Sequence, residues 1–281
     1  MNETLKRAIS GAIYIILLIT SILYSTQSFL LLFGVFLLIA TVEYCSLMKI
    51  KKTIPFLTAA LIYFLFYKIT SATNGLFYTL KFSKPFDLLV LGITLLVFIK
   101  CIIFLYENNT NPINLFSKYI YLIGYIILPF VIITKIPFGK AGYNPKILIS
   151  IFILIWTNDT FAYIVGKTIG KNKLFERISP KKTIEGFIGG VIFAVIASYL
   201  ISKYYIHIAE GKTFIWIIIA LIVGVFGTIG DLIESKFKRV AGVKDSGNIM
   251  PGHGGVLDRL DSVIFVAPII FTFYQILNYV S

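Results

Sequence analysis

The stretch TFIWIIIALIVGVFGTIGDLIE, residues 213–234, indicates a membrane-spanning helix, because no charged side chain lies between Phe214 and Gly230. A helix needs about 20 mainly apolar residues to cross the hydrocarbon core of a bilayer. The whole chain has the same character: 58% of its 281 residues are hydrophobic, 14% are charged, and the mean hydropathy is +0.89. Soluble domains are about one quarter charged. The sequence therefore predicts an all-α integral membrane protein.

Further apolar runs of similar length predict about nine transmembrane helices. They lie near residues 8–24, 28–48, 54–70, 86–106, 119–138, 147–168, 184–206, 213–234 and 260–280. The first run is long for a signal peptide and is followed by a poor cleavage site, so we expect an uncleaved helix. Residues 1–281 are predicted to form a single integral membrane domain, with a motif-bearing part at about 147–281 and an N-terminal helical region at about 1–146.

The distribution of cations predicts the orientation. With nine crossings, the N-terminus and the loops after the second, fourth, sixth and eighth runs share one side, which carries 16 of the 26 Lys and Arg residues against 8 on the other. The positive-inside rule places the richer side in the cytoplasm. We therefore expect a cytoplasmic N-terminus in the cell inner (cytoplasmic) membrane, with the loops after the sixth and eighth runs facing the compartment that holds nucleotides.

The composition also excludes some classes of site. Cys45 and Cys101 lie within apolar runs, without a metal-binding or disulfide spacing, and are expected to act as small hydrophobes. The net charge of +13 is explained by topology and by attraction to anionic membrane lipids. We expect no nucleic-acid binding.

Carboxylates at membrane depth are costly and are functional candidates by default. Asp231 ends the eighth run, and Asp258 and Asp261 open the ninth, three residues apart on one helical face. Asp231 and Glu234 form a second such pair. If the two helices are antiparallel neighbours, these acids converge into an oxygen-ligand site for Mg²⁺. The alternative is that Asp258 is a helix-start acid favoured by the helix dipole and that Asp261 pairs with a lysine.

The connecting segment SKFKRVAGVKDSGNIMPGHGG, residues 235–255, combines cations and glycines. Its cations can contact phosphate oxygens, its glycines let backbone N–H groups approach an anion, and a helix starting after Gly255 adds its positive end. These residues are Lys236, Lys238, Arg239, Lys244, Gly252, Gly254 and Gly255. The segment matches no familiar nucleotide-binding motif. The alternatives are a flexible basic loop attracted to lipid headgroups and, for His253, a structural hydrogen bond rather than a base.

A second polar cluster lies at residues 156–190. Asn158 and Asp159 interrupt an apolar helix, and nothing about topology requires them there, so we expect them to serve function. Glu43, in the second run, shows the same oddity. Ser179, Lys181 and Lys182 precede the seventh run, where Thr183 is expected to cap the helix. For the two lysines, membrane anchoring and phosphate contact both stay open.

Residues 235–262, SKFKRVAGVKDSGNIMPGHGGVLDRLDS, resemble the signature of phosphatidate cytidylyltransferases, also called CDP-diacylglycerol synthases. The elements ND...AY..G, SPKKT.EG..GG and GD upstream are similar to that family too, so the resemblance covers roughly residues 156–281. Met250 stands where the family more usually has Leu, Ile or Phe. The residues carrying the signature are Ser235, Lys238, Arg239, Lys244, Asp245, Pro251 to Gly255, Asp258, Arg259 and Asp261.

The resemblance implies an enzyme that joins CTP to phosphatidic acid, giving CDP-diacylglycerol and pyrophosphate in phospholipid biosynthesis. It implies a Mg²⁺ centre held by Asp231 and Asp258, and a Gly252-to-Gly255 turn near the triphosphate. Phosphate neutralisation is expected from Lys244, Arg239 and Arg259, while Asp261 and Asp159 are supporting acids. The expected catalytic residues are Asp231, Asp258, Lys244, Arg259 and Asp261. The expected substrate-binding residues are Ser235, Lys238, Arg239, Gly252, His253, Gly254, Gly255, Ser179, Lys181, Lys182, Asn158 and Asp159.

Two rival functions remain at this point. A CTP-dependent lipid kinase would transfer the γ-phosphoryl group instead, although the long signature favours nucleotidyl transfer. A transporter would also keep carboxylates inside helices, but it typically shows repeated halves with interrupted helices. The sequence does not give the oligomeric state, and a homodimer stays open.

Overall fold

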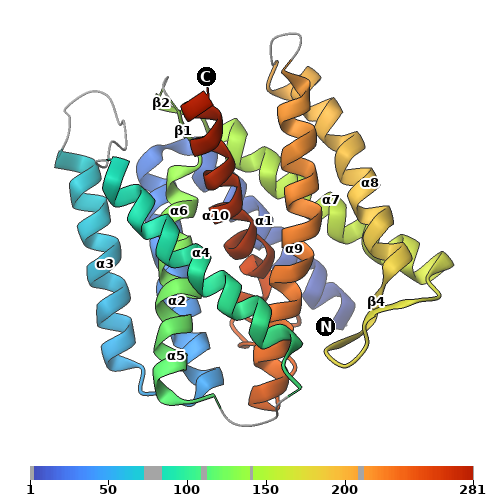
Figure 1. The fold of residues 1–281 in the computed structure, drawn as a ribbon, viewed down its shortest axis with the longest axis horizontal. Helices are drawn as coiled ribbons and strands as arrows, with labels where there is room; N and C mark the ends of the chain where they lie inside the picture. Colours follow the sequence, from blue (N-terminus) through green and yellow to red (C-terminus); the bar gives the residue numbers. More distant parts are fainter. Residues whose placement is uncertain (1–2, 73–83, 109–112, 140–141, 208–211, 281) are drawn as a thin grey trace.

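The computed structural model describes residues 3–72, 84–108, 113–139, 142–207 and 212–280 and shows a bundle of long helices (Figure 1). The helices are α1 (Glu3–Tyr24), α2 (Thr26–Met48), α3 (Thr53–Ala72), α4 (Lys84–Tyr106), α5 (Leu115–Tyr121), η1 (Leu122–Ile127), α6 (Leu128–Lys135), α7 (Pro145–Ile169), α8 (Ile184–Leu200), η2 (Ile201–Tyr205), α9 (Thr213–Ala241) and α10 (Leu257–Val280). Two short antiparallel hairpins join β1 (Phe138–Gly139) to β2 (Gly142–Tyr143) and β3 (Lys173–Phe175) to β4 (Ser179–Thr183).

The helices confirm the predicted all-α membrane class. Within the described residues, eight helical segments are long and apolar enough to cross a membrane. The third predicted run corresponds to α3, whose apolar part, Thr53–Tyr67, is shorter. The total of nine crossings therefore stays a prediction. The loop after α3 includes residues 73–83, which lie outside the described residues.

The fifth predicted run is continuous but changes its helical pitch. The segments α5, η1 and α6 follow one another without a break, and η1 is a π-helical stretch just before Pro129. Proline lacks an N–H group, and its ring clashes with the carbonyl four residues earlier. A wider turn relieves that clash, which explains how the run accommodates a proline.

Contacts between loops show which helix ends lie together. Lys118 Nζ, after α4, donates to the carbonyl of Met48 at the end of α2 (2.6 Å). Arg177, between β3 and β4, donates to the carbonyl of Glu107 (3.1 Å). Arg7 packs beside Gly252 of the loop after α9. The N-terminus and these loops therefore share one end of the bundle, at the bottom of Figure 1, as the predicted topology requires. The compartment that this end faces stays a prediction.

Small residues bring α9 and α10 into close contact. A Cβ atom at Gly230 would lie 2.8 Å from the carbonyl oxygen of Asp261, so only glycine fits at this crossing. Ser262 Oγ donates to the carbonyl of Gly227 at 3.3 Å. Close approach at small residues is typical of helix packing in membranes. The carboxylates of the two helices are thereby brought to one place, as the sequence predicted.

Helix α9 continues about two turns beyond the predicted end at residue 234. Phe237 is buried and packs on the rings of Tyr44, Phe104 and Tyr125, which stabilises the extension. Gly242 ends the helix in a left-handed conformation (φ 73°), which favours glycine. The predicted connecting loop is shorter than expected, because Ser235, Lys236, Lys238 and Arg239 belong to the helix.

Candidate active site

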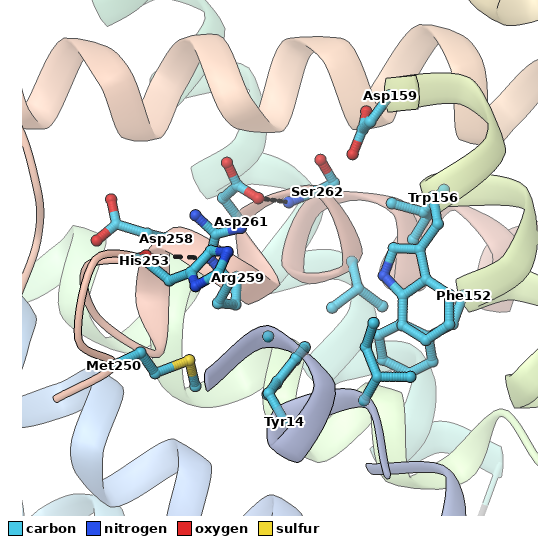
Figure 2. Close-up of a pocket in the computed structure, with 14 residues that line it drawn as sticks. Tyr14, Phe152, Trp156, Asp159, Met250, His253, Asp258, Arg259, Asp261 and Ser262 are labelled. Atoms are coloured by element: carbon cyan, nitrogen blue, oxygen red, sulfur yellow. Dashed lines mark hydrogen bonds between the residues drawn. The ribbon is translucent and has the colours of Figure 1, made fainter. Parts of the chain in front are cut away.

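A cavity of about 210 Å³ lies where α1, α7 and α10 meet the loop after α9 (Figure 2). One part of its wall is apolar and consists of Tyr14, Ile15, Phe152, Ile155 and Trp156, together with Met250 and Val263. The other part carries Asp159, His253, Asp258, Arg259, Asp261 and Ser262. The hydroxyl group of Tyr14 is buried and has no hydrogen-bond partner among the described residues. The cavity can therefore hold a molecule that has both a polar and an apolar part.

Asp159 of α7 and Asp258 and Asp261 of α10 line this cavity, whereas Asp231 of α9 is not part of its lining. Figure 2 shows the carboxylates of Asp159 and Asp261 on the same side of it, and the amide of Ser262 donates to Asp261 Oδ1 (2.6 Å). Asp231 of α9 is close enough to act electrostatically on Asp261. Like charges at membrane depth repel each other unless a cation lies among them. The negative charge of this cluster would therefore be offset by a bound cation or by a neighbouring lysine such as Lys182.

Asp258 is held by its own loop. Its Oδ2 atom accepts hydrogen bonds from the Ser246 amide (2.8 Å), the Ser246 hydroxyl (2.7 Å) and the Gly255 amide (2.7 Å). Its Oδ1 atom accepts from Lys238 Nζ at 2.6 Å. The carboxylate thus closes the loop onto the start of α10, in keeping with the helix-start alternative, while it also borders the cavity.

Two lysines neutralise the acids of α9. Lys182 Nζ lies 2.5 Å from Asp231 Oδ2, and Ser235 Oγ donates to Asp231 Oδ1 at 3.2 Å. Lys238 forms ion pairs with both Glu234 and Asp258. The hairpin β3–β4 carries Lys182 to this position. Among the predicted binding residues, Lys182, Ser235 and Lys238 are therefore brought to the acids.

The glycine-rich turn has a tight backbone. Gly252 (φ 78°) and Gly254 (φ 81°) are left-handed, and the Met250 amide donates to the carbonyl of Gly254 at 2.9 Å. The amides that follow already donate to carboxylates of the protein: that of Gly255 to Asp258, and those of Val256 (3.0 Å) and Leu257 (2.8 Å) to Glu43 of α2. The anion at this helix start is thus supplied by the chain itself.

His253 contacts the first helix. Its Nδ1 atom lies 2.8 Å from Ser10 Oγ, and its backbone carbonyl accepts from Arg259 Nε at 3.1 Å. Partial burial lowers the pKa of His253, and the positive charges of Arg259 and Arg7 lower this pKa further. A neutral imidazole with a fixed hydrogen bond agrees with the structural alternative for this residue.

Other predicted site residues lie away from the cavity. Asn158 is buried and faces glycines of α8 and α9, and its Oδ1 atom has no hydrogen-bond partner among the described residues. Arg239 Nε donates to the carbonyl of Ile178 at 3.3 Å. Lys181 and Lys244 are exposed, and Ser179 pairs with Phe175 in the hairpin. None of these five residues lines the described cavity.

The carboxylates of Asp231 and Asp258 offer at most a partial Mg²⁺ site. Mg²⁺ usually binds one or two carboxylates and completes its shell with phosphate oxygens and water. In the described part of the chain, no three or more His, Cys, Asp or Glu side chains lie together in a way that could hold a metal ion. Asp231 fits such a partial site, because Lys182 already places a positive charge against it. In Asp258, Oδ2 already accepts three hydrogen bonds, so only Oδ1 could bind the ion. Lys238 would first have to release Oδ1.

Several residues that reach the site from the first two helices were not assigned from the sequence, among them Ser10, Tyr14 and Glu43. Ser10 and Tyr14 gave no signal, because a serine and a tyrosine are ordinary in an apolar helix. Glu43 did give a signal, an acid inside a run, but its partners lie more than 200 positions away in the sequence. Trp156 of the cavity wall was indistinguishable from other apolar residues of its run.

Comparison with known proteins identifies the family of the chain. The chain is 49% identical over 121 residues to phosphatidate cytidylyltransferases of Staphylococcus haemolyticus (strain JCSC1435) and Staphylococcus aureus (strain COL). A phosphatidate cytidylyltransferase of Staphylococcus epidermidis is 45% identical over 120 residues. Each match spans 42% of this chain and 45% of the relative, less than half of the relative's length. The profile of the cytidylyltransferase family matches residues 5–277, so the chain belongs to the cytidylyltransferase family.

Proposed function

We propose that this protein is a phosphatidate cytidylyltransferase, which transfers CMP from CTP to phosphatidic acid. The observation that carries the proposal is the cavity, where acids of α7 and α10 meet the glycine-rich turn and Arg259, while Asp231 of α9 acts electrostatically on Asp261. The names of the matched relatives support the same reaction. The products are CDP-diacylglycerol, which stays in the bilayer, and pyrophosphate.

The two-sided cavity wall suits a lipid phosphate as one substrate. Phe152, Trp156 and Ile15 offer apolar surface for the glycerol ester region, whereas Arg259 offers a guanidinium to the phosphate. The buried hydroxyl of Tyr14 supplies a further polar contact. The amides at the start of α10 already donate to Glu43 and Asp258, so we place the triphosphate of CTP beside the cations rather than on these amides.

The proposed chemistry is an in-line displacement. A phosphate oxygen of phosphatidic acid forms a bond to the α-phosphorus of CTP, the bond from that phosphorus to the bridging β-phosphate oxygen breaks, and pyrophosphate leaves with the electron pair. The attacking phosphate is already anionic, so no strong general base is needed. The chain must hold two polyanions together and offset the developing charge. We assign these roles to Arg259 and Lys182, with Lys244 and Arg239 as further phosphate contacts.

Asp231 and Asp258 are the proposed Mg²⁺ ligands, with Asp261 and Asp159 as supporting acids. When bound, Mg²⁺ would neutralise phosphate charge and polarise the α-phosphoryl group. Lys182 and Lys238 balance the same carboxylates in the structure, and they become available to phosphate oxygens once a divalent cation takes that role.

We further propose that the site faces the cytoplasm from the cell inner membrane, because its end of the bundle carries most of the cations and CTP is cytoplasmic. A homodimer stays a prediction.

The test uses purified protein in detergent with phosphatidic acid, Mg²⁺ and CTP labelled at either the α- or the γ-phosphate. We expect the α label in the lipid and the γ label in pyrophosphate, with both transfers lost in Asp258→Asn. Transfer of the γ label to the lipid would instead show a CTP-dependent lipid kinase. Movement of neither label would overturn the proposal and leave transport as the function to test.

A further inference from the structure

Glu43 belongs to the N-terminal half of the chain, but its carboxylate contacts the loop between α9 and α10, residues 242–256, here called the signature loop. Glu43 lies near the end of α2 and is the one charged residue of that helix. The residue is 5% exposed. Burying an ionisable group at membrane depth is unfavourable unless hydrogen bonds or ion pairs offset the loss of its hydration. Its partners are therefore the first guide to its role.

The hydrogen bonds that Glu43 accepts within the described part of the chain all come from the segment between Ser246 and Leu257. Oε1 accepts from the Val256 amide (3.0 Å) and Oε2 accepts from the Leu257 amide (2.8 Å). The Ser246 hydroxyl lies 3.4 Å from Oε2 and donates its one proton at the shorter distance, 2.7 Å, to Asp258. Backbone N–H groups at a helix start have no partner within the helix. Glu43 thus caps α10 from another helix, where a residue of the loop itself normally would.

The glycines beside Glu43 fit this carboxylate closely. A Cβ atom at Gly247 would lie 2.5 Å from Glu43 Oε1, and one at Gly255 would lie 2.5 Å from Glu43 Cδ. Neither glycine has a left-handed backbone, so conformational freedom does not explain them. Space for Glu43 does explain them. Gly247 and Gly255 therefore leave the space that the Glu43 side chain of α2 occupies.

Ser246 connects Glu43 to Asp258. Its hydroxyl lies 3.4 Å from Glu43 Oε2 and 2.7 Å from Asp258 Oδ2, and its amide also donates to Asp258 Oδ2. All three side chains are buried or nearly so. A displacement of the Glu43 carboxylate therefore shifts both the start of α10 and the oxygen atoms of Asp258.

We infer that Glu43 is a positioning residue of the active site, which fixes the start of α10 and, through Ser246, the orientation of the Asp258 carboxylate. The inference rests on the proposed function for its effect on catalysis, and on geometry alone for its effect on the loop. The N-terminal helices thereby gain a specific role, because α2 supplies the anion that holds the signature loop closed.

The first test is hydrogen exchange of the wild-type protein and Glu43→Gln, in detergent and without substrates. We expect the peptide that contains the Val256 and Leu257 amides to exchange about ten-fold faster in the variant, the size of effect expected when a helix loses an N-cap. Glu43→Asp, which keeps the charge on a shorter side chain, should lie between the two. Equal exchange in wild type and Glu43→Gln would overturn the inference.

Glu185→Gln is the matched control. Glu185 also accepts backbone amides from a separate segment, those of Lys171 (3.0 Å) and Asn172 (3.1 Å), but it lies on α8. Its loss should speed exchange near residue 172 and leave the Val256 peptide unchanged. If Glu185→Gln loosens the Val256 peptide as much as Glu43→Gln does, the effect is general and the inference fails.

The second test separates positioning from simple loss of folded protein. In Glu43→Gln and in Ser246→Ala we expect the Mg²⁺ concentration for half-maximal rate to rise about ten-fold, as for the loss of an outer-shell partner of a metal ligand. A fall in kcat with an unchanged Mg²⁺ requirement in both variants would show a merely structural role. If Glu43→Gln does not fold, Ser246→Ala and Glu43→Asp decide the question. An inactive wild-type enzyme would refute the proposed function. The exchange experiment would still test whether Glu43 holds the start of α10, because it needs no activity.

Discussion

The hydroxyl of Ser10 on the first helix lies 2.8 Å from Nδ1 of His253 in the signature loop, across 243 positions of sequence. The same hydroxyl lies 3.0 Å from the carbonyl oxygen of Pro251. A Cβ atom at Gly11 would meet the imidazole ring at 3.1 Å, so α1 packs closely against the histidine. The first helix is therefore a wall of the site as well as a membrane anchor.

The environment of His253 predicts a dependence of stability on pH. Partial burial, Arg259 and Arg7 lower the pKa of His253 in the folded state, so the unfolded chain binds this proton more readily. The resulting stability is complete above the ordinary histidine value of about 6.5 and is lost as the pH falls toward the lower folded value. We expect the melting temperature of the wild type to fall more between about pH 7.5 and pH 5.5 than that of His253→Asn.

His207→Asn is the control for that experiment, because it removes the other histidine at a left-handed position (φ 55°) that asparagine tolerates. Its melting curve shows how far the loss of a histidine elsewhere in the chain alters the pH dependence. Parallel melting curves for wild type and His253→Asn would contradict the role assigned to His253.

The neighbouring lysines of the β3–β4 hairpin should differ in function. Lys182 reaches Asp231 at 2.5 Å, whereas Lys181 is exposed on the same strand. Because loss of one fixed donor at a charge-stabilising site costs about 10²–10³ in kcat, we expect Lys182→Met to fall into that range. Lys181→Met should stay within about three-fold of the wild type, as for an exposed anchoring charge. Steady-state rates of CDP-diacylglycerol formation measure both, and equal losses would favour a shared phosphate contact.

The sequence predicted the helices well and the hydrogen bonds of the loop poorly, for a physical reason. The hydrocarbon thickness fixes the length of a crossing, so apolar runs locate α7, α9 and α10 without knowledge of their neighbours. Helix periodicity predicted that Asp231 and Asp261 converge on the condition that their two helices are antiparallel neighbours, which the structure shows. The partners of Asp258 and Glu43 depend on how α2 and α9 pack, and no local pattern encodes that packing. The end of α9 was missed because burial of Phe237 comes from tertiary contacts.

Asp231 and Asp258 should respond differently to removal of their charge. Asp258 Oδ2 accepts three hydrogen bonds from Ser246 and Gly255, so Asp258→Asn should lower the free energy of unfolding by about 1–3 kcal/mol even without Mg²⁺. Asp231 accepts from one hydroxyl and one lysine and is one third exposed, so Asp231→Asn should leave stability nearly unchanged. Both variants should lose activity. Thermal unfolding in EDTA compares the stabilities of the two variants, and titration of the rate with Mg²⁺ compares their activities. Equal stability of Asp258→Asn and Asp231→Asn would show that Asp258 does not hold the loop.

The contact between α7 and α8 should tolerate no side chain at Gly186. A Cβ atom there would lie 2.6 Å from the carbonyl oxygen of Ala162 and 3.0 Å from Cα of Gly166, and both neighbours are backbone atoms that cannot rotate away. We expect Gly186→Ala to destabilise the protein by about 1–3 kcal/mol, as overpacking does.

Gly92→Ala is the control. The added Cβ atom would meet nothing within 4 Å, so helix propensity alone predicts a gain in stability of up to about 1 kcal/mol. Thermal unfolding in one detergent compares the two variants, and a Gly186→Ala protein as stable as Gly92→Ala would show that the two helices can separate without cost. Since α8 follows directly from the hairpin that carries Lys182, the same separation should also reduce the rate of CDP-diacylglycerol formation.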